Sequence, residues 1–303
     1  DKDSLAGRAL SVRLHPLSQA ELRGSLGRGA FVDRLLERID DPAGLAVAVP
    51  PSRVDVVELL LRGGYPSIRE AGTRLRTAWL SDYVERLLGV DAREGGGRLD
   101  PLRLAAVLRL IAANQSGELV KARIAQEAAL SAASVTGYLD ALDRLYLTED
   151  LHPWAVNLTA REIGRRKVRV GDSGLAAWLC GASVGLLKDV VRGGKVFGAL
   201  LEGFVVGELS AQAGWAEVDY RLYHYRDRRG LEVDVIIELG DGRVIAVEVK
   251  SAAGLTGRHF AGLTDLKRKL GDRLAAGVVL APVDEPMRYA EGLWGLPLNT
   301  LWE

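Results

Sequence analysis

Residues 231–250 read LEVDVIIELGDGRVIAVEVK, which is two apolar runs separated by Gly240-Asp241-Gly242. Because glycine tolerates positive φ, this triplet is a strong signal for a tight hairpin between two strands. Strand alternation predicts an apolar face and a polar face. The apolar face holds Val233, Val235, Ile237, Val247 and Val249, and the other face holds Glu232, Asp234, Ile236, Glu248 and Lys250. A hairpin centred on residue 241 places Asp234 opposite Glu248, with side chains about 4.5–5.5 Å apart.

Two carboxylates at that separation repel each other unless a proton or a cation lies between them. A hard divalent ion such as Mg²⁺ or Mn²⁺ takes oxygen ligands, and Asp234, Glu248 and the backbone carbonyl of Val249 can supply them. Such an ion polarises a phosphodiester and activates a bound water. We expect Lys250 beside the attacking water or the phosphate, and Glu202 on the preceding helix as a further ligand or base.

The region around this hairpin, residues 194–303, predicts an α/β domain on a mixed sheet. The expected helices cover residues 197–213 and 256–274, and the expected strands cover residues 220–225, 231–239, 243–249, 277–281 and 296–301. The first six of these elements have the order α-β-β-β-α-β, and the strand over 296–301 follows them.

Residues 101–193 show the plan of a winged helix-turn-helix. Three helices are expected at residues 102–113, 120–129 and 131–147, with Ser131 as an N-cap, followed by short strands at 147–151 and 167–170. A basic run lies on or beside the wing, where it can meet a phosphate backbone: Arg161, Arg165, Arg166, Lys167 and Arg169. The third helix begins without Arg, Lys, Asn or Gln to read base edges, so non-specific DNA contact and a purely structural role both stay open.

Residues 23–100 predict a small helical domain, and residues 1–22 predict a separate leading segment. Helices are expected over 18–39, 53–62 and 75–88, with Ser18 and Ser52 available as N-caps. The alternation of apolar residues over 10–14 predicts one strand before His15-Pro16.

The composition agrees with a multidomain α/β protein and excludes several classes. The chain has 303 residues, 48% of them apolar, with 40 basic and 40 acidic side chains, so a uniformly basic nucleic-acid coat is excluded. The middle third is nevertheless net +4 and the last third net −4. One cysteine and four scattered histidines disfavour disulfides and a zinc site. Since no apolar run could span a membrane and no leader opens the chain, we expect a cytoplasmic protein without a membrane partner.

The order Glu202, Asp234, Glu248-Val249-Lys250 resembles the PD-(D/E)XK nuclease superfamily, including the helix glutamate of its Holliday-junction-resolvase-like branch. More closely, the chain resembles the C-terminal part of a family of bacterial and archaeal AAA-type ATPases that carry a DUF4143 domain. Nearly the whole chain contributes matching motifs. They are Ser4–Arg8, Pro16–Ser18, Glu21-Leu22, Gly63–Pro66, Trp79, Asp82-Tyr83, Asp172–Ala176, Leu201–Val205, Glu208-Leu209, Glu232–Asp234 and Ile245–Ser251.

The resemblance implies an upstream P-loop ATPase, but no G-x-x-x-x-G-K-[ST] run occurs in this sequence. The segment 1–22 is then the tail of the ATPase module, Arg8 a nucleotide-sensing arginine, and ATP acts only through the upstream domain. The only methionine is Met287, which agrees with loss of an upstream portion or with processing. The implied partners are DNA, the upstream ATPase domain and, as an option, further copies of the chain. Two functions stay open: metal-dependent phosphodiester hydrolysis, and a non-catalytic regulatory module whose carboxylates are neutralised by Lys250.

Overall fold

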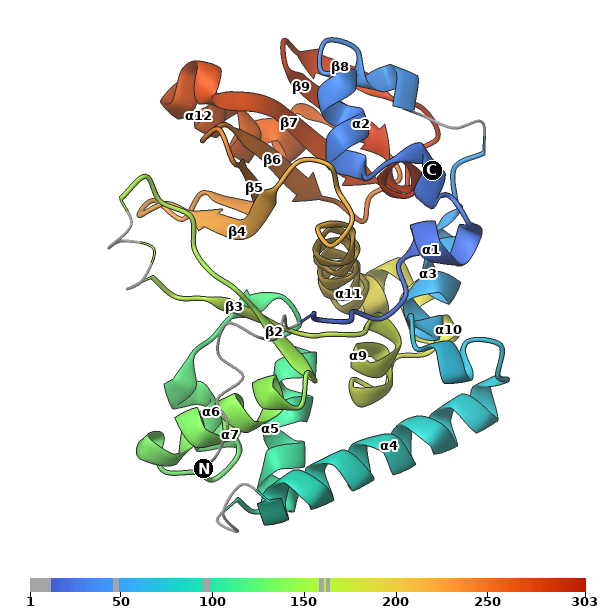
Figure 1. The fold of residues 1–303 in the computed structure, drawn as a ribbon, viewed down its shortest axis with the longest axis vertical. Coiled ribbons are helices and arrows are strands. Elements are labelled where there is room, and N and C mark those ends of the chain that lie inside the picture. Colours follow the sequence, from blue (N-terminus) through green and yellow to red (C-terminus); the bar gives the residue numbers. More distant parts are fainter. Residues whose placement is uncertain (1–11, 46–48, 95–98, 158–160, 162–163) are drawn as a thin grey trace, which may run out of the picture.

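A computed structural model of the chain shows a mixed α/β fold with a three-stranded and a six-stranded sheet (Figure 1). The structure describes residues 12–45, 49–94, 99–157, 161 and 164–303, with the backbone alone for residues 90–94. In Figure 1 the six-stranded sheet and the three-stranded sheet with its helices lie at opposite ends of the molecule, and helix α11 lies between them. Within the described ranges, no helix combines the length and the apolar character that a membrane crossing requires.

The N-terminal part is helical. Its elements are α1 (Gln19–Arg23), η1 (Leu26–Arg28), α2 (Phe31–Glu37), η2 (Pro42–Leu45), α3 (Arg53–Arg62), η3 (Pro66–Ile68) and α4 (Thr73–Glu94), where η denotes a 3-10 helix. Ser18 and Ser52 cap α1 and α3, each in a capping box, as the sequence predicts. The single helix expected over 18–39 is wrong, because Gly24 adopts the left-handed conformation at φ +67° and ends α1.

Residues 12–18 form an extended segment, which we call the N-terminal strap. The predicted strand over 10–14 falls partly outside the described residues, and residues 12–14 pair with no strand among those described. The strap is instead fastened further along, where the Leu17 amide donates to the Gly64 carbonyl at 2.9 Å. The alternation of apolar residues in the strap therefore reflects an extended chain. Among the described residues, scattered contacts hold it, and not the hydrogen-bond ladder of a β-sheet.

The middle part contains α5 (Pro101–Ala113), β1 (Gly117–Glu118), α6 (Lys121–Glu127), α7 (Ala132–Arg144), β2 (Thr148–Leu151) and β3 (Lys167–Val170). The strands form an antiparallel sheet in the order β1-β3-β2. Ser131 caps α7 by accepting from the Ser134 amide at 3.2 Å. The three helices and β2 and β3 lie where the sequence predicts them. Three further elements are additions to that prediction: β1, α9 (Ser173–Leu179) and α10 (Val184–Lys188).

The C-terminal part is a three-layer α/β structure. It contains α11 (Val190–Gln212), β4 (Tyr220–Arg226), β5 (Glu232–Leu239), β6 (Val244–Val249), η4 (Gly257–Phe260), α12 (Ala261–Leu270), η5 (Gly271–Arg273), β7 (Leu274–Ala281), β8 (Met287–Ala290), β9 (Leu293–Pro297) and η6 (Leu298–Leu301). The mixed sheet has the order β4-β5-β6-β7-β9-β8. Helix α11 packs on one face and α12 on the other, so both faces are buried. The predicted last strand ends at Pro297, and η6 replaces its second half.

The β5–β6 hairpin has the predicted register. Val235 pairs with Val247 and Ile237 with Ile245, both symmetric about residue 241. One detail of the predicted faces is wrong, because Val233 packs in the α12-side core while Val235 packs on the α11 side. The β4–β5 pairing shifts between Tyr223 and Tyr225, and this irregularity breaks the two-residue alternation next to Asp234.

Candidate functional site: a carboxylate–lysine cluster

Four carboxylates and two lysines meet where β5 begins and β6 ends, beside α11 and β3. We call this group the carboxylate–lysine cluster. Its members are Lys167, Glu202, Glu232, Asp234, Glu248 and Lys250. They come from the three-stranded sheet, from α11 and from the hairpin, so the cluster exists only when these elements pack together.

The hairpin half of the cluster contains Asp234, Glu248 and Lys250. The Val249 amide donates to Asp234 Oδ2 at 2.8 Å, and the Asp234 amide donates to Glu248 Oε2 at 3.3 Å. Lys250 Nζ lies 2.5 Å from Glu248 Oε1 and 3.7 Å from Asp234 Oδ2. The structure thus brings together the three charged residues that the hairpin register placed side by side.

The helix half of the cluster joins Glu202 to Lys167 of β3. Lys167 Nζ lies 2.8 Å from Glu202 Oε1 and 2.7 Å from Glu232 Oε1, and its side chain is only 4% exposed. Sequence reasoning assigned Lys167 to DNA contact and gave Glu232 no role. The sequence did contain a signal for Glu232, because it lies on the same predicted strand face as Asp234. It contained no signal that Lys167 would contact Glu202.

Burial and crowding of negative charge disturb the acidic groups. Burial, and then the charge of Asp234, raise the pKa of Glu202 to about 8 and that of Glu248 to about 7. Burial works against the charge of Lys167, but Glu202, Asp234 and Glu232 outweigh it and raise the Lys167 pKa. Two ammonium groups face four carboxylates, so the cluster is short of positive charge.

The donor chemistry of the cluster fits a hard divalent cation, because carboxylate oxygens and the Val249 carbonyl are ligands that Mg²⁺ and Mn²⁺ accept. These oxygen ligands do not all converge on one position where a metal ion could bind. In the part of the chain that the structure describes, no three His, Cys, Asp or Glu side chains are grouped so that they could hold one metal ion. Glu202 is paired with Lys167, while Asp234 and Glu248 are paired with Lys250.

The basic residues predicted to contact phosphates are mostly engaged in ion pairs. Arg161 donates to Glu238 through two bonds of 2.7 and 2.6 Å, Arg166 pairs with Asp150, and Arg169 pairs with Glu149. Lys167 lies inside the cluster. Arg165 differs, since 69% of its side chain is exposed and Glu118 lies 3.7 Å away. The predicted nucleotide-sensing residue, Arg8, lies outside the described residues.

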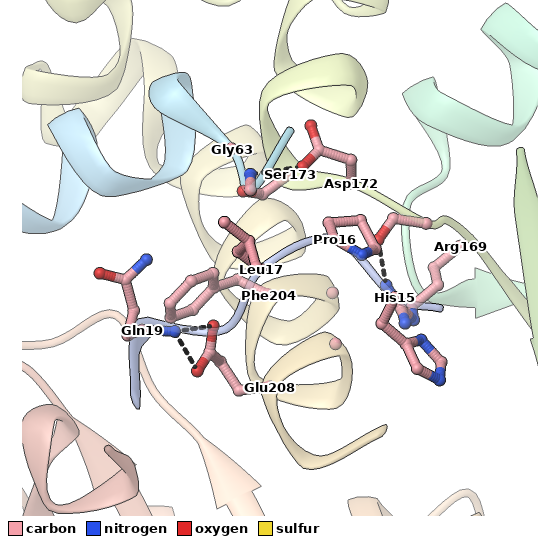
Figure 2. Close-up of a pocket in the computed structure, with 14 residues that line it drawn as sticks. His15, Pro16, Leu17, Gln19, Gly63, Arg169, Asp172, Ser173, Phe204 and Glu208 are labelled. Atoms are coloured by element: carbon pink, nitrogen blue, oxygen red, sulfur yellow. Dashed lines mark hydrogen bonds between the residues drawn. The ribbon is translucent and has the colours of Figure 1, made fainter. Parts of the chain in front are cut away.

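A second site surrounds the N-terminal strap, where it crosses α11 and the start of α9 (Figure 2). The buried Asp172 carboxylate accepts from the Gly64 amide at 2.6 Å and from the Leu175 amide at 2.7 Å. A Cβ at Gly64 would lie 2.5 Å from the Leu17 carbonyl oxygen, so only glycine admits the strap this closely. The remaining cavity is small, about 30 Å³.

The residue that follows the strap, Gln19, is hydrogen-bonded to a buried carboxylate of α11. Glu208 accepts two bonds from the Gln19 amide, at 3.0 and 2.9 Å, as Figure 2 shows. Burial raises the pKa of Glu208 to about 8. Asp172 and Glu208 belong to motifs quoted for the family resemblance, yet sequence reasoning gave neither a role. In the structure, Asp172 holds the turn at Gly64 that contacts the strap, and Glu208 holds the Gln19 amide directly after the strap.

Comparisons with known proteins find two family models that match different parts of the chain. Residues 53–185 match the model of a domain of unknown function (DUF8612). The chain is 28% identical over 247 residues to the uncharacterized proteins Mb2031c of Mycobacterium bovis and Rv2008c of Mycobacterium tuberculosis, which covers 75% of this chain. It spans about half, 54%, of the length of these curated relatives. No solved structure matches. Residues 197–301 match the model of the domain of unknown function DUF4143, so the part of the chain that carries Glu202, Asp234, Glu248 and Lys250 is a DUF4143 domain.

Proposed function

We propose that the chain is a DNA-associated module of an AAA-type ATPase, with a metal-dependent nuclease-like site for phosphodiester hydrolysis. The observation that carries this proposal is the contact of Lys250 with both Asp234 and Glu248 in the β5–β6 hairpin, with Glu202 of α11 near enough for the charge of Asp234 to raise its pKa. The order of these residues along the chain and their elements resemble the PD-(D/E)XK arrangement. The α5–β3 region resembles a winged helix-turn-helix.

In this proposal Asp234, Glu248 and the Val249 carbonyl would hold Mg²⁺ or Mn²⁺, which when bound supplies a polarised phosphate and a more acidic water. Lys250, whose ammonium group already contacts both carboxylates, would neutralise and orient the phosphate. Glu202 would join as a further ligand of the ion or take the proton from the attacking water. Its pKa of about 8 is close to the range in which general acid–base groups work near neutral pH.

The association with DNA and with an ATPase rests on separate observations. The middle third of the chain carries a net charge of +4, and the exposed Arg165 can meet a phosphate backbone without losing a buried partner. The DUF4143 match and the greater length of the relatives support an additional domain, for which an ATPase is our proposal. Further copies of the chain in an assembly are part of the same proposal.

A second candidate function is a non-catalytic regulatory module that binds DNA or a protein. The observation that favours it is the lysine pairing of the cluster, since Lys167 and Lys250 neutralise Glu202 and Glu248 directly. A salt-bridged pocket of this kind can stabilise the packing of α11, β3 and the hairpin without any reaction.

A cleavage assay separates the two functions. The full chain is incubated with supercoiled plasmid and with branched DNA, in Mg²⁺ or Mn²⁺, and compared with Asp234→Asn, which removes a charged ligand without changing the size of the side chain. Asp241→Asn, in the exposed turn of the same hairpin, is the matched control. We expect cleavage by the wild type and by Asp241→Asn, and background cleavage by Asp234→Asn. Cleavage that survives in Asp234→Asn places the reaction elsewhere, and DNA binding without cleavage supports the regulatory module.

A further inference from the structure

Lys167 enters the carboxylate–lysine cluster from outside the DUF4143 domain. It is the first residue of β3, within the DUF8612 match, while its partners Glu202 and Glu232 belong to the DUF4143 match. The side chain is 4% exposed, so its charge is compensated by carboxylates rather than by water: Glu202 and Glu232 contact it at 2.8 and 2.7 Å, and Asp234 adds to their effect. One part of the chain therefore supplies a cation to the candidate site of the other.

We propose that Lys167 is a resident counter-ion that holds Glu202 away from the Asp234–Glu248 pair, so that a divalent cation can recruit Glu202 only when the Lys167 ammonium group withdraws. This inference rests on the proposed metal site. It assigns to Lys167 a positioning role that sequence reasoning did not foresee.

The contacts around Glu202 support this role. Glu202 is paired on the Lys167 and Glu232 side, whereas Asp234 is tied to the Val249 amide and to Lys250. The two halves of the cluster are thus held by different lysines. An ammonium group and a divalent ion compete for the same carboxylate oxygens, and because Lys167 and most of these carboxylates are largely buried, salt screens this competition less than it would at the surface.

A network of contacts fixes the position of β3 and so of Lys167. Arg169, two residues further along β3, pairs with Glu149 of β2. Glu149 also binds the strap, with His15 Nδ1 at 3.2 Å and Arg13 at 3.4 Å. The strap, Glu149 and β3 are consequently one connected group, and a shift of the strap changes the hold on the strand that delivers Lys167.

The test measures Mn²⁺ binding to the full chain by isothermal titration calorimetry. Lys167→Met keeps the length of the side chain but removes the charge, and Lys167→Arg keeps the charge. Because one nearby charge changes the affinity of a site for a cation by roughly ten- to a hundredfold, we expect Lys167→Met to bind Mn²⁺ that much more tightly than the wild type. Lys167→Arg should stay close to the wild-type affinity.

Two controls keep the result specific. Lys269→Met removes another lysine that lies between two carboxylates, Asp227 at 2.9 Å and Asp265 at 2.7 Å, outside the cluster, and should leave Mn²⁺ affinity unchanged. Asp234→Asn combined with Lys167→Met should abolish the gain. If Lys167→Met fails to fold, Glu149→Gln takes its place in the test. This change loosens β3 without altering a residue of the cluster, and it should also raise the affinity for Mn²⁺.

The outcomes separate this inference from the proposed function. Equal Asp234-dependent affinity in the wild type and Lys167→Met would overturn the counter-ion role and leave the metal site standing. Binding by neither protein would overturn the metal site and the inference together. Binding by Lys167→Met alone would support both.

Discussion

At the scale of single residues, Glu208 makes the stability of this chain depend on pH. Its carboxylate is buried and accepts two bonds from the Gln19 backbone amide, and burial raises its pKa from the ordinary 4.5 to about 8. The folded state therefore binds the proton more tightly than the unfolded state does. By linkage, the contribution of Glu208 to stability is fully present below about pH 4.5 and is lost as the pH rises to about 8.

We predict that Glu208→Gln removes this loss. The amide cannot ionise and its oxygen can still accept from Gln19, so the variant should gain stability over the wild type between pH 5 and 8, by on the order of a few kcal/mol at the upper end. Urea denaturation at several pH values measures this difference. The exposed Glu58→Gln should show a flat difference across the same range. A flat profile for Glu208→Gln as well would mean that Glu208 ionises like a surface carboxylate.

At the scale of elements, Asp172 links the start of α9 to the turn after α3. As the N-cap of α9 it accepts from the Leu175 amide at 2.7 Å, and the same carboxylate accepts from the Gly64 amide at 2.6 Å. The turn that it holds is the one that supports Leu17 of the strap. One carboxylate thus positions a helix, a turn and an extended segment from three distant parts of the chain.

We predict that Asp172→Ala costs about 2–4 kcal/mol, because it removes a helix cap and leaves a buried amide without its partner. The matched control is Ser183→Ala, which removes the exposed N-cap of α10 and its bond from the Leu186 amide at 3.2 Å. That change should cost about 0.5–1 kcal/mol. The free energy of unfolding from chemical denaturation measures both, and similar costs would show that the Gly64 anchor contributes nothing.

At the scale of the whole molecule, one apolar core joins the parts that the sequence divides into domains. The same buried cluster contains Leu60 of the helical region, Leu142 of the α5–β3 region, and Leu201 and Trp302 of the C-terminal part. Polar contacts follow the same path, since the Phe31 amide donates to Gln212 at 2.7 Å and Arg34 donates to the Thr300 carbonyl at 2.8 Å.

We predict that this shared core makes unfolding cooperative over the whole chain. Differential scanning calorimetry should show a single transition, with a calorimetric enthalpy equal to the van't Hoff enthalpy. Separate transitions would instead support the division at residues 22, 100 and 193 as independent folding units.

Much of the secondary structure and half of the candidate site follow from the sequence alone. The Gly240–Gly242 turn and the two-residue period of its strands are local properties, and they determine the pairing that brings Asp234 beside Glu248. Helix caps are local for the same reason, and Ser18, Ser52 and Ser131 act as predicted. Periodicity failed at Gly24 and beside Asp234, where a left-handed residue and a shift in strand pairing override it.

Only the tertiary structure decided which charges meet. Lys167 and Glu202 are 35 residues apart, and Gln19 and Glu208 are 189 apart. A basic run in a sequence looks the same whether its side chains face solvent or buried carboxylates, because the partner of a charge depends on which elements pack together. The packing encloses the ion pairs of Lys167 and Arg169 but leaves the neighbouring Arg165 exposed. Because the strength of an ion pair depends on its burial, these neighbours in the sequence contribute differently.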